Sequence, residues 1–533
     1  MSGEPVLVLS SEPKQTAAAA GLKYGHGAGS TRVPLLAFAI AVVVALAMRA
    51  VMLPRLVQGG LYDDGYITLR YAANIAEGHG FVYNVGEPVW GTTTPLFTLI
   101  LSGTARVFGS AALEMSALII GLVCSFLFWL LLAVILEKQK VPRSISAVVL
   151  LVVLFSPAYF ENSLSGMETP LVLALLVASL WAYIQKRPIA LGVLAALLLL
   201  ARIDTAIWLA VLGFSFLGSQ WRVKRTAILK ALVAFLVVAL PWHVYAYMTF
   251  HSLIPQSVVG KAVSHAAFSR LDWSDFVRLY NVYLPILRLG TWAWIGIATT
   301  FLLMLVGLRT LWKEFPGLCP LGVYFFLFVA VFFASKSPLY MWYFPPTQWI
   351  AVLLILCGVR AIWDRGLLHG ASAPVRIAPY AAYGTWVVAL AAWSDFSLPQ
   401  SRSALRPWAD LGDFIRDQTR EGDKVFLEHI GIVGYRSHRP IIDNMGLVSP
   451  EIISLKRQYP ENYEWLRRAL VQFQPKVVVL YPAEDPIRGK GNWQPKERDW
   501  FENEYNVVRT VEDAHGTATA YVYQRKHADA DAH

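Results

Sequence analysis

The chain has 533 residues, of which 56% are hydrophobic and only 15% charged, and its formal net charge is +10. A soluble domain cannot bury so large an apolar fraction, so the composition excludes a soluble protein and predicts a membrane protein. The positive charge does not indicate a nucleic-acid partner, because the basic residues gather in short loops between apolar runs. The three cysteines have no paired or metal-binding spacing, so we expect neither disulfides nor a zinc site.

The first 33 residues are polar and lack the pattern of a cleavable signal peptide, so residues 1–33 are expected to form a disordered cytoplasmic tail. A membrane span takes roughly 20 apolar residues, and fewer where a short helix lines a cavity. On this basis the chain contains about eleven spans, predicted at 34–53, 113–136, 144–160, 170–185, 189–201, 205–218, 229–248, 291–309, 318–335, 341–361 and 378–394.

Basic clusters predict the orientation of these spans. They lie at 138–143, 186–187, 222–230, 309–313 and 360–376, in loops with few acids, and such loops face the cytoplasm. The N-terminus is then cytoplasmic and the C-terminal region lies outside. The remaining loops also face outward, at 54–112, 161–169, 202–204, 249–290 and 336–340.

Residues 94–108 are apolar enough for a short span. Counting them as one would invert every later loop and place the basic clusters outside. We therefore predict an amphipathic or half-immersed helix on the outer face of the membrane.

The composition changes near residue 401, which divides a transmembrane domain, 34–400, from an α/β domain, 401–526, with a frayed tail at 527–533. The predicted fold is thus a polytopic α-helical membrane protein with a C-terminal extracytoplasmic α/β domain. Within that domain we predict helices at 405–419 and 461–473 and strands at KVFLEHIGIVGY (424–435), KVVVLY (476–481) and ATAYVYQR (518–525).

The segment LYDDGYITLRYAANIAEGHGFVYNVGEPVWGTTTPLF, residues 61–97, carries the densest set of polar side chains. Apolar residues spaced four apart predict a short helix at 65–77, with Asp63 and Asp64 at its start. One interpretation is that these acids cap the helix and complement its dipole. The other is that a carboxylate beside an apolar cavity acts as a general base, or helps to bind a divalent cation.

These residues carry a family resemblance. The pattern DDxYITxRYAxNxAEGHGxVYNxGExxxGxTxPL resembles the first outer loop of the GT-C superfamily of membrane glycosyltransferases, and in particular bacterial members related to the mycobacterial terminal arabinofuranosyltransferases. The resemblance implies that Asp63 and Asp64 are catalytic. It also implies a polyprenyl-phosphate sugar as donor, with arabinofuranose as the best guess, and a cell-envelope glycan or surface protein as acceptor. The enzyme would work at the outer face of a bacterial inner membrane.

The resemblance also suggests binding residues along the chain. In the first outer loop these are Arg70, Tyr71 and His79. In the second, SLSGMETPL offers Glu168, which could instead simply precede a helix that starts at Thr169.

Between two short spans, ARID offers Arg202 and Asp204, although Ile203 replaces the proline that is usual in related sequences. An arginine and an aspartate at membrane depth are costly and usually functional, but these two could also merely pair with each other.

Further along, HSLIPQSVVGK offers His251 and Lys261, and Lys261 or Arg202 is a candidate partner for the donor phosphate. Lys261 could equally be an interfacial lysine that meets anionic headgroups. Tyr343, in SKSPLYMWYFPP, is a donor-side candidate or part of an aromatic belt.

The C-terminal domain offers His429 and Asp443 as acceptor contacts. For Asp443 the alternative is a turn before Gly446.

Two other classes of protein fit the composition: a lipid or polysaccharide transporter, and a non-catalytic scaffold for envelope assembly. A transporter predicts an internal repeat and polar residues along a path to both faces, whereas the candidate polar residues here gather on one face. Soluble-enzyme motifs such as a P-loop, GxSxG or HExxH are absent from the sequence.

Overall fold

The computed structural model describes residues 60–220, 225–265, 293–335, 340–367, 377–385 and 405–526, apart from 461, 462, 490, 492 and 514, together with isolated positions elsewhere. The chain forms two units, 1–44 and 45–533, and the helices and strands from residue 60 onward belong to the second. The predicted tails at 1–33 and 527–533 lie outside the described residues, as do nearly all of the span at 34–53 and part of the span at 378–394.

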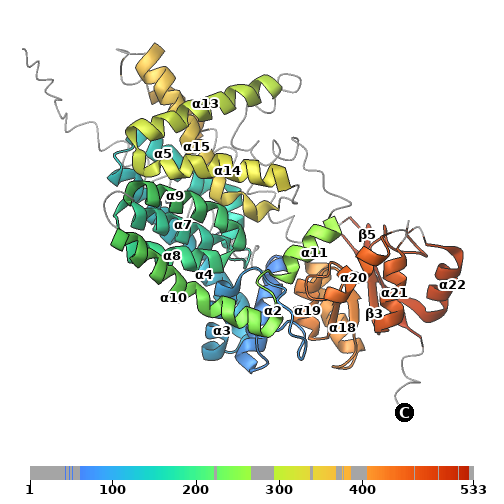
Figure 1. Ribbon diagram of the computed structural model, residues 1–533. Coiled ribbons are helices and arrows are strands. Elements are labelled where there is room, and N and C mark those ends of the chain that lie inside the picture. The colour runs from blue at the N-terminus through green and yellow to red at the C-terminus, as the bar shows by residue number, and fades with distance from the viewer. Residues whose placement is uncertain are drawn as a thin grey trace, which may run out of the picture. The chain divides into compact units, whose positions relative to one another are not determined.

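The helical part of the chain follows the predicted order of spans (Figure 1). Its long helices are α4 (Leu113–Lys138), α10 (Arg225–Phe250), α13 (Ala293–Glu314), α14 (Cys319–Ser335), and α15 (Pro345–Val359) together with the η7 segment (Arg360–Leu367) that continues it. Its shorter ones are α5 (Arg143–Phe155), α6 (Pro157–Ser163), α7 (Thr169–Ile184), α8 (Pro188–Ala201), α9 (Ala206–Gln220) and α11 (Gln256–His265). Short 3-10 turns lie before or between them, η1 (Ser110–Ala112), η2 (Ile203–Thr205), η5 (Pro316–Leu318) and η6 (Met341–Tyr343), and the π-helical segment η7 follows α15.

Within the described residues, five helical stretches are long and apolar enough to cross a membrane: Ser110–Lys138, Arg225–Phe250, Ile295–Glu314, Pro316–Ser335 and Pro345–Trp363. Many of their large apolar side chains are exposed, as at Leu122 and Phe126 of α4 and at Val233 and Val237 of α10. Surfaces of this kind are stable only against an apolar medium.

Small residues let the membrane helices approach closely. A Cβ at Gly307 of α13 would collide with the backbone of Leu354 in α15, and one at Gly358 would collide with that of Leu303. Packing through glycine is typical of membrane helices, where no hydrophobic driving force favours association. Helix α15 is buried along almost its whole length.

The segment predicted as the first outer loop, and called so below, begins with α2 (Asp63–Glu77), which starts two residues before the predicted helix and ends at the left-handed Gly78. Helix α3 (Pro95–Phe108) is a short helix of 14 residues, and it packs against α2. Its buried Phe97, Leu101 and Ala105 recur four apart, while Val107 and Phe108 are exposed. This spacing agrees with the predicted amphipathic helix.

The C-terminal domain has a five-stranded sheet in the order β2-β1-β3-β5-β4. Strands β2 (Ile441–Asp443), β1 (Val425–Leu427) and β3 (Val477–Leu480) are parallel, and β5 (Ala518–Arg525) and β4 (Tyr505–Glu512) add antiparallel pairs. The helices are α18 (Arg406–Gln418), α19 (Ile430–Ser437), α20 (Pro450–Gln458), α21 (Glu464–Phe473) and α22 (Pro495–Glu504).

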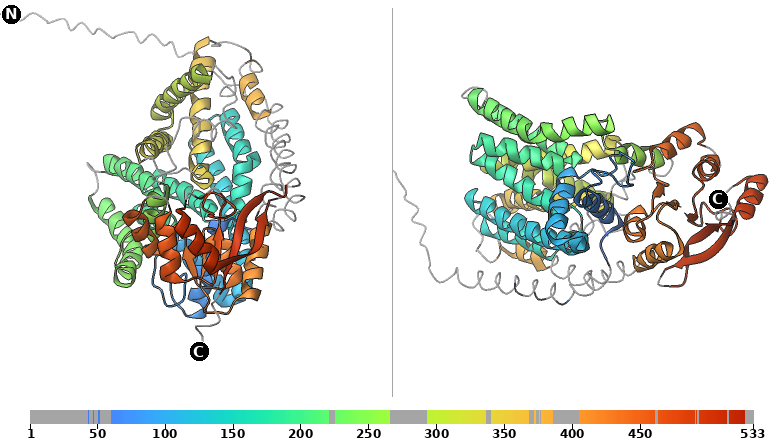
Figure 2. Two further views of the ribbon diagram at one scale, coloured as in Figure 1. Left: turned by 90° about the vertical axis from the view of Figure 1, so that its right-hand side faces the viewer. Right: turned by 90° about the horizontal axis from the view of Figure 1, so that it is seen from below.

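Alternate strand residues face opposite layers of this domain. Val425 and Leu427 pack on the side of α18 and α19, in one core with the residues of α2, while Phe426 packs on the side of α20 and α21. The views in Figures 1 and 2 agree that α19 lies beside α2. The sheet therefore has helices on both faces, and one of its helical layers meets the first outer loop.

One prediction in this domain is wrong. The run 424–435 is a strand only at Val425–Leu427, and Ile430–Ser437 is helix α19. The run has two glycines three apart, Gly431 and Gly434, which lie against the first outer loop at a distance that no side chain allows. The predicted helices and the strands at 476–481 and 518–525 are confirmed within a few residues, whereas β2, α20, α22 and β4 were not foreseen.

Candidate functional site

A polar pocket lies where the first outer loop meets the ends of the membrane helices. Its charged lining comes from four segments: Asp64 of α2, Glu168 before α7, Arg202 after α8, and Lys261 of α11. Further lining residues are Ile67, Thr68, Gly91, Thr92, Thr93, Thr94, Met167, Ser257, Trp342, Tyr343 and Leu447. Five of the predicted site residues thus meet in one place, including Tyr343.

Asp64 and Lys261 form the central ion pair of this pocket. The Lys261 Nζ donates to Asp64 Oδ2 at 3.1 Å, and it also lies 4.7 Å from the ring centroid of Tyr340 and 5.6 Å from that of Trp342. Burial lowers the pKa of Lys261, but the Asp64 carboxylate and the nearby tyrosines outweigh it and raise that pKa above its ordinary value. The lysine therefore stays charged and offers a fixed cation beside the carboxylate.

Arg202 forms the second charged centre, and only 2% of it is exposed. Its Nε donates to Asp204 Oδ1 at 2.7 Å and its Nη2 to Asp204 Oδ2 at 3.1 Å, while its Nη1 lies 3.6 Å from Glu168 Oε1. The guanidinium also lies 5.3 Å from the Tyr343 ring centroid. A buried arginine of this kind is stable only with such partners, so the two acids hold the cation at the edge of the pocket.

Asp63 faces away from the pocket. Its two carboxylate oxygens accept the backbone N–H groups of Gly431, at 3.1 Å, and Ile432, at 2.8 Å. Consecutive helical residues point about 100° apart, which follows from 3.6 residues per turn, so the neighbouring acids meet different partners. Burial raises the pKa of the Asp63 carboxyl, against the opposing effects of His429 and the two amides.

Arg70 and Tyr71 form hydrogen bonds outside the pocket. Arg70 donates to the carbonyl oxygens of Gly434 and Arg439, both at 2.8 Å, in the C-terminal domain. The buried Tyr71 donates to the Val89 carbonyl oxygen at 2.6 Å and is not among the pocket residues. Both side chains hold the loop together.

The structure does not bring His79 or His251 to the pocket. His79 is exposed just after α2, with its Nε2 4.0 Å from a carboxylate oxygen of Glu77. His251 is exposed at the end of α10, where its φ is 52°.

His429 and Asp443 are also engaged within the C-terminal domain. The His429 ring stacks on Trp408, with centroids 4.0 Å apart, and hydrogen-bonds the Tyr481 hydroxyl. Asp443 is fully buried and accepts backbone N–H groups from the turn after it, as the alternative interpretation expects; one of them belongs to Leu447, which lines the pocket.

Sequence reasoning missed the hydroxyl side of the pocket. Thr92, Thr93 and Thr94 line it, and the Oγ1 atoms of Thr92 and Thr94 lie 2.9 Å apart. The signal was the run of three threonines directly before Pro95. In the part of the chain that the structure describes, no group of three His, Cys, Asp or Glu residues is placed to hold a metal ion.

Comparison with known proteins adds three similarities. Residues 398–527 match a family model described as "Domain of unknown function (DUF8728)". Over 246 residues the chain is 28% identical to the terminal beta-(1->2)-arabinofuranosyltransferase of Mycobacterium tuberculosis. That match covers 42% of this chain and only 39% of the relative, so the chain spans well under two thirds of that protein.

The third similarity is structural. The crystal structure of ArnT from Cupriavidus metallidurans in the apo state superposes with a TM-score of 0.52 and 14% sequence identity, covering 91% of this chain and 98% of that one. The same protein bound to undecaprenyl phosphate gives the same TM-score and identity, with 97% of that chain covered.

Together the arrangement of helices and these similarities define the class of the molecule. It is a polytopic helical membrane protein with a C-terminal sheet domain. Its fold is similar to that of the ArnT structures.

Proposed function

We propose that the protein is a glycosyltransferase that moves a sugar from a polyprenyl-phosphate donor to an acceptor hydroxyl. One observation carries this proposal: the pocket places the Asp64 carboxylate 3.1 Å from the Lys261 ammonium, with the buried Arg202 lining the same pocket. A carboxylate suits removal of a proton, and two cations suit a phosphate leaving group. The relative from M. tuberculosis, and the undecaprenyl phosphate in the ArnT structure, support the class of donor.

In this reaction the acceptor oxygen forms a bond to the anomeric carbon of the sugar, and the bond from that carbon to the phosphate oxygen breaks. The acceptor proton passes to Asp64. The polyprenyl phosphate leaves with one more negative charge, which Lys261 and Arg202 offset. Glu168 and Asp204 hold Arg202 in place, and Tyr343 lies beside the guanidinium.

We infer the finer features from the sequence. They are about eleven spans, a cytoplasmic N-terminus, and an extracytoplasmic domain at 401–526 in a bacterial inner membrane. Arabinofuranose is the proposed sugar, and a cell-envelope glycan or surface protein is the proposed acceptor. That Asp63 or Asp64 helps to bind a divalent cation stays a prediction. His429 stays a predicted acceptor contact, although its ring stacks on Trp408 and does not line the pocket.

The test is transfer from a short-chain lipid-phosphate sugar by purified Asp64→Asn. We expect kcat to fall by about 10²–10⁴, the usual contribution of a general base. The matched control is Glu77→Gln, which removes an exposed carboxylate from the other end of the same helix. Transfer by Asp64→Asn at the rate of Glu77→Gln would refute the proposal.

A further inference from the structure

Helix α19 of the C-terminal domain lies along α2, and charged side chains of α2 meet both of its ends. At the start of α19, the Asp63 carboxylate accepts the N–H groups of Gly431 and Ile432. These amides belong to the first turn of a helix, where no backbone carbonyl is available to them and the helix dipole is positive. A carboxylate satisfies both the hydrogen bonds and the charge.

Arg70 meets the other end of α19. Its Nη1 donates to the Gly434 carbonyl oxygen and its Nη2 to that of Arg439, each at 2.8 Å. Arg70 follows Asp63 by seven residues, about two turns, so both project from one face of α2. An acid therefore meets the positive end of α19 and an arginine its negative end.

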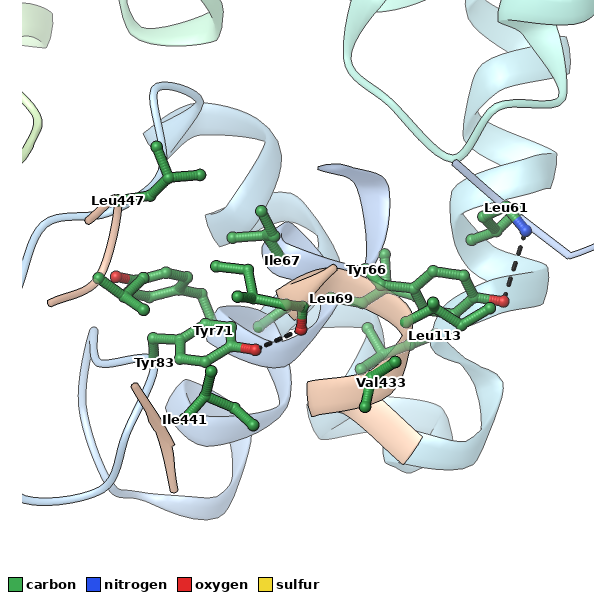
Figure 3. Packing of buried hydrophobic residues seen from close by; sticks show 14 of the residues in the cluster. Leu61, Tyr66, Ile67, Leu69, Tyr71, Tyr83, Leu113, Val433, Ile441 and Leu447 are labelled. Atoms are coloured by element: carbon green, nitrogen blue, oxygen red, sulfur yellow. Dashed lines mark hydrogen bonds between the residues drawn. The ribbon is translucent and has the colours of Figure 1, made fainter. Parts of the chain in front are cut away.

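The backbones of the two helices are in direct contact. A Cβ at Gly431 would collide with the carbonyl oxygen of Asp63, and one at Gly434 would collide with the Tyr83 hydroxyl. The Tyr83 side chain (Figure 3), from the loop after α2, adds to this contact, because its hydroxyl donates to the Ile430 carbonyl oxygen at 2.5 Å. The contact thus depends on the glycines of α19, which allow close approach, and on the charged side chains of α2, which meet the two ends of α19.

The contact fixes α2 from the side opposite the pocket. Asp64 follows Asp63 directly, so any shift or rotation of the first turn of α2 moves both carboxylates. On the pocket side Lys261 holds Asp64, and on the domain side α19 holds Asp63. The position of Asp64 therefore depends on both.

We propose that Asp63 is a positioning residue rather than the proton acceptor: with Arg70 it docks α19 onto α2, and the C-terminal domain thereby sets the position of Asp64 in the pocket. This inference rests on the proposed function, in which Asp64 is the base. It assigns different tasks to two adjacent acids. It also gives the C-terminal domain a direct part in the reaction.

The experiment compares Asn and Ala at each position in the full-length protein. An asparagine at 63 still offers one oxygen to the α19 amides, so Asp63→Asn should retain kcat within about 10-fold of the unaltered protein, while Asp63→Ala loses more. At position 64 neither Asn nor Ala accepts the proton, so both variants should lose about 10²–10⁴ in kcat. The pH at which kcat falls on the acid side should be the same in Asp63→Asn as in the unaltered protein.

A second readout follows the docking itself. Hydrogen exchange in residues 430–437 should speed up most in Asp63→Ala, less in Asp63→Asn, which keeps one of the two amides bonded, and stay slow in Asp64→Asn. If Asp63→Ala does not accumulate in the membrane, the comparison of Asp63→Asn with Asp64→Asn decides whether Asp63 is a positioning residue. Asp63→Asn at least 10-fold faster than Asp64→Asn supports the inference.

The outcomes separate the two proposals. Full turnover in Asp64→Asn refutes the proposed function. An inactive Asp64→Asn together with an equally inactive Asp63→Asn, whose α19 amides remain protected, leaves the proposed function in place and overturns the positioning role of Asp63.

Discussion

The Lys261 ammonium lies 3.1 Å from the Asp64 carboxylate, although 197 residues separate them in the chain. The lysine comes from a short helix after the span α10, and the acid comes from the first outer loop. Both side chains are partly exposed, at 23% for Lys261 and 30% for Asp64, so a ligand in the pocket reaches them. A phosphate that binds Lys261 would free Asp64 from its ion pair at the moment when a proton acceptor is needed.

The first prediction concerns Lys261. Lys261→Met should lower kcat/KM for the lipid-phosphate donor by about 10²–10³, the loss typical of removing one group that stabilises a developing anion. Lys261→Arg keeps the positive charge and should recover part of that loss. Lys424→Met removes an exposed lysine of the C-terminal domain and should change nothing. An unaltered kcat/KM in Lys261→Met would remove the lysine from the mechanism.

A second prediction separates binding from stability at Arg202. Arg202→Met leaves Glu168 and Asp204 buried without their cation, and loss of one partner of a buried ion pair costs about 3–5 kcal/mol. The melting temperature in detergent should drop clearly. Adding Glu168→Gln and Asp204→Asn should restore most of the stability but no transfer activity. Activity in this triple variant would show that Arg202 serves the fold alone.

A third prediction concerns pH and Glu428. Burial raises the pKa of Glu428 from 4.5 to about 7, helped by the nearby Glu484 and Asp443 and opposed by Lys456. Between pH 4.5 and about 7 the folded state keeps a proton on Glu428 that the unfolded state has lost. This group therefore lowers the free energy of unfolding as the pH rises from about 4.5 to about 7. The loss is at most about 3 kcal/mol, from 1.36 kcal/mol for each pH unit.

Hydrogen exchange of the β1 amides, corrected for the intrinsic effect of pH, measures this slope. Glu428→Gln should flatten it and should stabilise the domain at pH 8. Glu421→Gln, at an exposed position of the same domain, is the control and should leave the slope in place. A slope that persists in Glu428→Gln would assign the titration to another group.

Local signals in the sequence were enough for most of the membrane helices and for the break at Arg202. Apolar runs predicted the spans, and the left-handed Gly78 ended α2 near the expected residue, because both features depend on neighbouring residues alone. Local signals were not enough to show that Asp63 and Asp64 have different partners. That distinction depends on two amides, 368 and 369 residues further along the chain, which donate to Asp63. Strand β2 was not predicted for another reason: its three residues are too few to show an alternating pattern.

The last prediction concerns Asp443, whose contacts are those of a structural residue. It is fully buried, and its oxygens accept the N–H groups of Met445, Leu447 and Val448. Asp443→Asn would place an NH₂ group against these donors and leave at least one of them unbonded, which costs about 1–3 kcal/mol. Because Leu447 lines the pocket, the loosened turn should raise KM more than it lowers kcat.

Asp513→Asn is the matched control for this change, because Asp513 also accepts backbone N–H groups within a turn but is not buried. Water replaces the lost bonds there, so both KM and hydrogen exchange should stay unaltered. In Asp443→Asn, exchange at residues 445–448 should speed up together with the rise in KM. A large loss of kcat with an unaltered KM and slow exchange would instead mean that Asp443 contacts the reacting groups.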